Sequence, residues 1–270
     1  MALIPESSPS VMGIVNVTPD SFFAASRTAA TDHAVSRGVQ LFAMGCDIVD
    51  VGGESTRPGA HAVSVNEELA RVMPVVSSLA QYGPVSIDTR KEEVAVATVA
   101  AGAVVINDVS GALVEVAGQL QVGYVAMHSQ GPPETMQRSP HYGDVVAEVL
   151  NVLEALARRA RDVGVRQLWL DPGIGFGKTF EHNVSLVAHC ADFVELAGRY
   201  DAGVLIGTSR KKFLGSLGSE ELEVDERLEG SIATEAWALL SGVAMIRVHD
   251  VGPALQLREL MARPVMEVGS

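Results

Sequence analysis

The chain has 270 residues, 47% of them hydrophobic, and a formal net charge of −13. It is long enough for one large domain or two small ones, and its acidity argues against nucleic acid or an anionic membrane as the main partner. No run approaches about 18 apolar residues and the N-terminus lacks a basic, apolar leader, so we expect no membrane span and a cytoplasmic protein. Cys46 and Cys190 stand far apart without a second pair, which argues against a disulfide framework or a zinc site.

Short apolar runs rich in β-branched residues alternate along the chain with segments of helical period. The expected strands are 11–17, 47–53, 84–89, 103–109, 123–128, 167–173, 203–209 and 244–250. The expected helices are 29–45, 64–81, 91–101, 112–121 (the weakest pattern), 144–163, 182–199, 228–241 and 252–262. This alternation predicts a parallel sheet covered by helices, and eight repeats match a (β/α)8 TIM barrel of the α/β class better than an open sheet. We expect a single domain over residues 1–270, with residues 1–10 as a flexible N-terminal extension.

Residues suited to ligand binding stand where each expected strand ends. They are Asn16, Glu54, Thr56, Arg57, Asp88, Asn107, Asp108, Met127, His128, Asp171, Ser209, Arg210, Lys211, Arg247 and His249. The C-terminal strand ends form the active-site face of such a barrel. Any one of these residues could be a turn former or a helix cap. Their recurrence at all eight ends, with cations gathered in an acidic protein, indicates a site for an anionic small molecule.

Two other site types are not supported. The segment "DPGIGFGKT" ends like a phosphate-binding P-loop, but Pro172 stands where the first glycine should be. Its glycines suit a loop that lets the backbone approach a flat ligand, with Phe176 either closing over that ligand or packing in the core. The histidines form no HExxH or HxH pattern, so we expect no catalytic zinc site.

The last two strands offer an anion site. "GTSRKKFLG" leaves strand seven and leads into a helical stretch at Lys211, and "RVHDVG" leaves strand eight with Arg247 and His249. Barrels of this type often bind phosphate there, helped by helix N-terminal N–H groups. A surface set of salt bridges is the alternative reading.

In this order and spacing, the motifs resemble those of the dihydropteroate synthase family almost from end to end. The motifs are "MGIVNVTPDSF", "VDVGGESTRPGA", "SIDT", "INDVSG", "MH", "DPGIGFGKT", "GTSRKKFLG" and "RVHDV". The resemblance implies condensation of 6-hydroxymethyl-7,8-dihydropterin pyrophosphate with para-aminobenzoate, with Mg²⁺ as the cofactor. It also implies a sulfonamide target.

The resemblance also implies roles for single residues. The pterin slot would be lined by Asp88, Asn107, Met127, Asp171, Phe176 and Lys211. The pyrophosphate would be held by Asn16, Thr56, Arg57, Arg247 and His249, with Asn16 also contacting Mg²⁺. Val248 would be a further substrate-binding residue. The aminobenzoate pocket would be formed by Phe22, Pro58 and Lys212. The catalytic set would be Asn16, Arg57, Lys211, Arg247 and His249.

The first loop of the resemblance, "NVTPDSF", departs from the family pattern after Phe22. Ala24 stands where the family usually has an acidic residue, and a glycine pair is missing after it. This departure bears on loop closure, turnover and the sulfonamide response. Two alternatives therefore stay open, a pterin-binding paralogue without synthase activity and a pterin-dependent methyltransferase. The apolar segment "SIATEAWALLSGVA" favours a homodimer.

Overall fold

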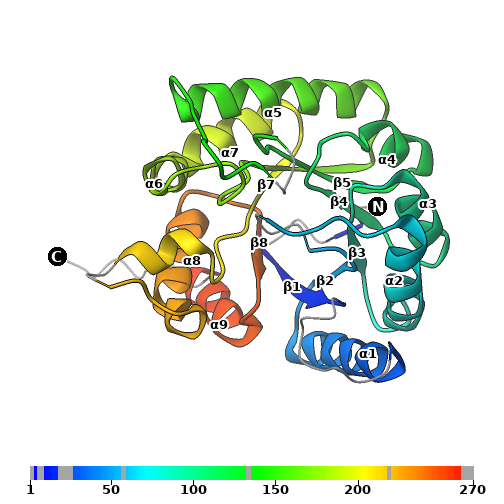
Figure 1. Cartoon of the computed structure of the whole chain (residues 1–270). Coiled ribbons are helices and arrows are strands. Elements are labelled where there is room, and N and C mark those ends of the chain that lie inside the picture. Colours follow the sequence, from blue (N-terminus) through cyan, green and yellow to red (C-terminus); the bar gives the residue numbers. More distant parts are fainter. Residues whose placement is uncertain are drawn as a thin grey trace.

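Eight parallel strands close into a barrel, each paired with the next along the chain and the last with the first (Figure 1). The structure, a computed structural model, describes residues 3–4, 9–17, 27–55, 59–131, 135–217 and 220–262. The strands are β1 (Ser10–Asn16), β2 (Ile48–Gly52), β3 (Val85–Asp88), β4 (Val105–Asp108), β5 (Gly123–Met127), β6 (Gln167–Asp171), β7 (Gly203–Ile206) and β8 (Met245–Val248). The TIM-barrel prediction is confirmed.

Helices surround the barrel in chain order (Figure 1). They are α1 (Arg27–Met44), α2 (Val65–Leu79), α3 (Glu92–Ala100), α4 (Val114–Leu120), α5 (Val145–Asp162), α6 (Phe180–Ala188), α7 (Cys190–Arg199), α8 (Leu228–Leu240) and α9 (Val251–Ala262). The helix expected over 182–199 is divided at His189 into α6 and α7. Within the described ranges, no helix is both long and apolar enough to cross a bilayer.

The segment after β7 differs from the expected helix. It forms two short 3₁₀ helices, η1 (Lys212–Leu217) and η2 (Val224–Arg227). The chain folds back between them, because Leu222 N donates to Gly215 O at 2.9 Å and the Arg227 guanidinium donates to Leu222 O. A Cβ on Gly215 would lie 3.0 Å from both groups, so the turn is closely packed around this glycine. A 3₁₀ helix rather than an α-helix therefore follows Lys211.

The side chains that point into the barrel form an apolar floor. This floor consists of Ile4, Met12, Ile48, Val105, Val125, Trp169, Leu205 and Met245. The alternate residues of the strands, such as Val49, Ile106 and Val248, point outward and pack in a second cluster beneath the helices. The floor stabilises the barrel and leaves its opposite end for the site.

The N-terminal residues that the structure describes contact this floor. Ile4 is buried, and the backbone N–H groups of Leu3 and Ile4 both donate to Gln167 Oε1 at 3.0 Å. Strand β1 begins at Ser10, which is also buried. Burial of an isoleucine under the barrel explains why this part of the segment is held.

Candidate active site

A polar layer lies inside the barrel directly above the floor. It consists of Asp50, Asp88, Asn107, Asp171 and Arg247, together with Met127. Because side chains alternate along a strand, Ile48 of the floor places Asp50 in this layer, and Val105 and Trp169 likewise place Asn107 and Asp171. The strand ends thus bring together at the barrel mouth the residues predicted for the pterin slot, and they add Asp50.

Arg247 is the hub of this layer. Its Nε donates to Asp50 Oδ2 at 2.7 Å, and a terminal nitrogen donates to Asp88 Oδ2 at 2.8 Å. Asn107 Nδ2 donates to the same Asp50 oxygen at 2.9 Å. Asp50 is fully buried, and its other oxygen, Oδ1, has no hydrogen-bond partner among the described residues. Asp50 therefore fixes both Arg247 and Asn107 from beneath.

The pKa values of the ionisable side chains at the mouth are strongly shifted. Burial raises the pKa of Asp88 to about 7, against the opposing pull of Arg247 and with repulsion from Asp50 adding to it. Burial also raises the pKa of Asp171, although the Lys211 charge lowers it. Burial opposes the charged form of Arg247, but Asp50 and Asp88 together hold the pKa of its guanidinium above its usual value. Such shifts of neighbouring buried groups mark candidates for substrate binding.

The glycine-rich loop after β6 forms one wall of the mouth. Gly173 N donates to Asp171 Oδ1 at 2.7 Å, which fixes that carboxylate. Lys211 Nζ donates to Ile174 O and lies 4.4 Å from the centre of the Phe176 ring. Burial, with Arg247 nearby, lowers the pKa of Lys211 to about 8. Gly175 has a φ of +83°, and a Cβ there would lie 3.1 Å from the Lys211 side chain, so the close approach favours glycine.

Lys178 holds this loop from behind. Its buried ammonium donates to Gly173 O at 2.9 Å and to Phe176 O at 3.1 Å, and it contacts His128 Nδ1 at 3.0 Å. Burial and the Lys178 charge together lower the pKa of His128 to about 3, so the imidazole is neutral and can accept from the lysine. The "GKT" lysine is thus a loop support, consistent with the rejection of a P-loop. His128 supports the loop rather than lining the mouth.

Some residues at the strand ends point away from the mouth. The side chain of Val248, expected to bind substrate, is fully buried in the cluster beneath the helices, because it alternates with Arg247. Asp108 accepts hydrogen bonds from Ser110 N, Leu113 N and Tyr124 OH, and so stabilises the loop after β4.

Glu54 is likewise bound within the protein. Its carboxylate accepts from Arg90 Nε at 2.8 Å, Lys91 Nζ at 2.5 Å and Val63 N at 2.8 Å. These contacts join the loop after β2 to the start of α3. They offset the effect of burial and lower the pKa of Glu54. Glu54 is therefore a support of this loop.

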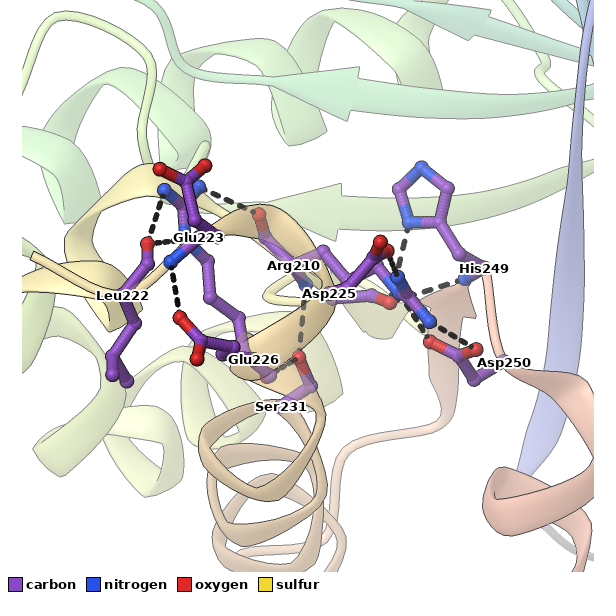
Figure 2. A network of polar contacts seen from close by, with 10 residues as sticks. Arg210, Leu222, Glu223, Asp225, Glu226, Ser231, His249 and Asp250 are labelled. Atoms are coloured by element: carbon purple, nitrogen blue, oxygen red, sulfur yellow. Dashed lines mark hydrogen bonds and ion pairs between the residues drawn. The ribbon is translucent and has the colours of Figure 1, made fainter. Parts of the chain in front are cut away.

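The ends of β7 and β8 meet in a corner formed by Ser209, Arg210, His249 and Asp250, which we call the anion corner (Figure 2). Arg210 Nε and a terminal nitrogen donate to the two oxygens of Asp250 at 2.7 and 2.8 Å. The other terminal nitrogen reaches Asp225 Oδ1 at 2.7 Å. Ser209 Oγ lies 3.1 Å from His249 N and 3.2 Å from His249 Nδ1. The cation of Arg210 is therefore engaged with carboxylates of the protein.

The two loops predicted to close over the substrates are largely outside the described residues. This applies to Phe22 and Ala24 of the first loop and to Thr56, Arg57 and Pro58 of the second. Lys212, predicted for the aminobenzoate pocket, is exposed at the start of η1. Asn16 is exposed at the end of β1. The roles of these residues remain predictions.

Asp50 and Lys178 were missed as site residues by sequence reasoning. Asp50 stands in the apolar run "DIVDVGG", and its charge on the inward face of a strand was the available signal. Lys178 was considered only as part of a P-loop. Its buried role depends on the fold of the glycine-rich loop around it, and no sequence pattern indicates that role separately.

Comparisons with known proteins find relatives that match this chain along most of its length. The family model described as "Pterin binding enzyme" matches residues 12–249. The dihydropteroate synthase of Escherichia coli K12 is 44% identical over 254 residues, 91% of this chain and 88% of that protein. Two solved dihydropteroate synthases superpose over most of their length. The Yersinia pestis enzyme in complex with a sulfonamide drug has a TM-score of 0.86 at 37% identity, covering 96% of this chain and 94% of its own. The Xanthomonas albilineans enzyme with 4-aminobenzoic acid has a TM-score of 0.85 at 42% identity, covering 96% and 95%.

Proposed function

The chain belongs to the dihydropteroate synthase family of pterin-binding transferases, and from this premise we propose how its residues perform the condensation. The substrates are 6-hydroxymethyl-7,8-dihydropterin pyrophosphate and para-aminobenzoate, and the products are 7,8-dihydropteroate and pyrophosphate. The observation that carries the proposal is the polar layer, in which buried carboxylates and an amide face one arginine above an apolar floor.

The polar layer suits the edge of a pterin ring. Its amino and ring N–H groups are hydrogen-bond donors. The side-chain oxygens of Asp88, Asn107 and Asp171 can accept these hydrogen bonds. Asp88 can do so if Arg247 releases its contact there, while Arg247 Nε stays on Asp50. Lys211 is placed to donate to the ring carbonyl or a ring nitrogen, and Phe176 and Met127 pack against the ring. Freed from Asp88, the Arg247 guanidinium can lie over the ring face and reach toward the pyrophosphate.

The reaction needs a stabilised leaving group and an attacking amine, and no residue need act as a nucleophile. The bond between the pterin methylene carbon and the pyrophosphate oxygen breaks, and its electron pair leaves with pyrophosphate. The cation that remains is delocalised into the pterin ring. The amine nitrogen of para-aminobenzoate then bonds to the carbon and loses a proton to solvent. Arg247 and His249 stabilise the charge that develops on the leaving group.

Mg²⁺ fits the mouth as a cofactor bound mainly through the substrate. No group of three His, Cys, Asp or Glu side chains in the described ranges could hold a metal ion. Asn16 offers an exposed amide oxygen beside Asp88, since both approach the same side of Gly52. One amide ligand with phosphate oxygens and water is a set that Mg²⁺ accepts. When bound, the ion would supply positive charge to the leaving pyrophosphate.

Para-aminobenzoate would bind between the two loops and η1. Phe22 and Pro58 would pack against its ring, and Lys212, exposed at the start of η1, would attract its carboxylate. Thr56 and Arg57 would close over the pyrophosphate, so that this pocket is complete only when the pyrophosphate is present. The Xanthomonas enzyme with 4-aminobenzoic acid and the Yersinia enzyme with a sulfonamide support such a pocket in this family.

Two further features belong to the proposal. Trp237 and Leu240 of α8 are exposed, at 53% and 73% of their surface, which favours a homodimer formed through this helix.

Cys46 and Cys190 are free and buried, and burial raises their pKa values to about 11 and about 12, which suits a reducing cytoplasm.

A steady-state assay of dihydropteroate formation tests the proposed function. We expect product from the two substrates with Mg²⁺, inhibition by a sulfonamide, and loss of product when EDTA removes the metal. Pterin binding without product would indicate the paralogue without synthase activity. Methyl transfer to a corrinoid acceptor would indicate the methyltransferase.

A further inference from the structure

We propose that Ser209 and Arg210 are positioning residues that orient His249 toward the pyrophosphate without touching it. The inference rests on the proposed function, in which the anion corner holds that group. Ser209 determines which ring nitrogen of His249 carries the proton, and Arg210 holds the main chain of His249 in place.

The Ser209 hydroxyl is placed to fix the tautomer of His249. The backbone N–H of His249 can only donate, so its 3.1 Å contact occupies a lone pair of Ser209 Oγ. The same oxygen lies 3.2 Å from His249 Nδ1. Among the described residues the Ser209 hydroxyl has no other hydrogen-bond partner, so its proton is directed to Nδ1. Nδ1 is then an acceptor, and the neutral ring carries its proton on Nε2.

The geometry of the ring turns this tautomer into a directed donor. In Figure 2 the ring of His249 stands above the cluster, with one nitrogen toward it and the other pointing away. Nε2–H on the outer side can donate to a phosphate oxygen, whereas the opposite tautomer would present a lone pair there. An anion such as pyrophosphate binds to the N–H donor and not to a lone pair. The hydroxyl of Ser209 therefore determines whether the neutral ring of His249 attracts or repels the pyrophosphate.

Arg210 pins the backbone around His249. Two nitrogens of its guanidinium donate to the two oxygens of Asp250, the residue that follows His249. The third nitrogen donates to Asp225 in η2. Arg210 itself adopts a φ of +56°, an uncommon conformation for a residue with a side chain. This conformation is held because Arg210 N donates to Ser231 Oγ in α8 at 2.9 Å. On the other side, Arg37 of α1 donates to His249 O at 3.1 Å. The corner is thus fixed from β7, α8, η2 and α1.

The test uses protein labelled with ¹⁵N-histidine and long-range ¹H–¹⁵N correlation spectra, in which the two neutral tautomers give different patterns. His249 is assigned by the loss of its signals in His249→Gln. We expect the Nε2–H pattern for His249 in the wild-type protein and a mixture of tautomers in Ser209→Ala. Calorimetry should show that Ser209→Ala binds inorganic pyrophosphate with Mg²⁺ about tenfold more weakly, as for the loss of one oriented hydrogen bond. Its affinity for 6-hydroxymethylpterin should stay unchanged, which also shows that the variant is folded.

Two further variants sharpen the test. Arg210→Lys keeps the charge but lacks the fork, so pyrophosphate affinity should fall while the Nε2–H pattern stays. The matched control is Ser241→Ala, whose hydroxyl donates to Trp237 O at the C-terminal end of α8, the opposite end of the helix from Ser231. It should change neither measurement.

Several results would overturn the inference. They are an unchanged His249 pattern in Ser209→Ala, an Nδ1–H pattern in the wild-type protein, or unchanged pyrophosphate affinity in both Ser209→Ala and Arg210→Lys. Failure of the proposed function would look different. The wild-type protein would then bind no pyrophosphate, while the histidine spectra would still decide which tautomer Ser209 selects.

Discussion

The floor and the mouth of the barrel are built by the same strands, two residues apart, and they have opposite characters. Below, Ile48, Val105 and Trp169 are buried among apolar neighbours and contribute hydrophobic stabilisation. Above them, Asp50, Asn107 and Asp171 are also buried but polar, and burial works against the charged form of Asp171. The fold therefore takes its stability from one layer and its chemistry from the next. Changes in the floor should act on stability, and changes in the mouth on binding.

The largest effect is expected in the floor. Trp169 is almost fully buried, and Gly123 and Gly203 pack closely against its ring. Trp169→Ala should lower the free energy of unfolding by ~3–5 kcal/mol, because a large cavity replaces the indole. Urea unfolding measures this loss, and pterin affinity measured on the folded variant should change little. A stable variant that no longer binds pterin would break the division between the two layers.

The next effect concerns the anion corner. His249→Ala should weaken binding of pyrophosphate by ~1.5–3 kcal/mol, the range for a hydrogen bond to a charged group. Binding of a pterin without pyrophosphate should be unaffected, because His249 lies outside the polar layer. Calorimetry with both ligands makes this comparison. Equal losses for the two ligands would mean that His249 supports the fold or the pterin slot instead.

A pH effect on stability is expected from a buried carboxyl behind the anion corner. Burial, together with the charge of Asp250, raises the pKa of Glu235 in α8 from 4.5 to about 8. Between these values the native state retains a proton that the unfolded chain has lost, so stability falls as the pH rises through this window. Glu235→Gln should therefore be more stable than the wild-type protein at pH 8, by about 1–3 kcal/mol, and the gap should close toward pH 4.5. Urea unfolding across the window measures it, and a gap independent of pH would contradict the assignment.

The smallest effects are expected in the first loop. Phe22→Ala should raise the Michaelis constant for para-aminobenzoate and leave pterin affinity nearly unchanged, because Phe22 is predicted to contact only the second substrate. Ala24→Asp should raise turnover if a carboxylate there stabilises the pterin cation, and should change little if Asp20 already supplies that charge. Steady-state kinetics with both substrates measures the two variants. Para-aminobenzoate that binds equally well without pyrophosphate would rule out assembly of the pocket by loop closure.

Much of the barrel could be predicted from the sequence, because apolar runs and helical segments alternate eight times. The positions of Asp88, Asn107 and Asp171 at the barrel mouth also follow from that pattern, since each lies at or next to the end of a strand. The same alternation distinguishes Arg247, which points inward, from Val248, which points outward. The alternation also accounts for Asp108 facing the helices.

Other features depend on contacts between distant segments, which no local pattern encodes. Arg247 binds Asp50 across 197 positions of sequence, and Lys178 reaches His128 across 50. The engagement of Arg210 with Asp250 and Asp225 removes it from the cations available to a ligand. The 3₁₀ helix after Lys211 depends on the packing of Gly215 against Arg227. Such features required the folded chain.

Calorimetry of pterin binding to Asp171→Ala tests the central claim most directly, because this carboxylate belongs to the polar layer and Gly173 N already fixes its position. Removing it leaves buried N–H donors of the pterin without an acceptor, at ~1–3 kcal/mol per group and more where charge is involved. We predict that the variant stays folded and no longer binds 6-hydroxymethylpterin measurably. Unchanged affinity would show that Asp171 does not contact the pterin and that the polar layer is not the pterin site.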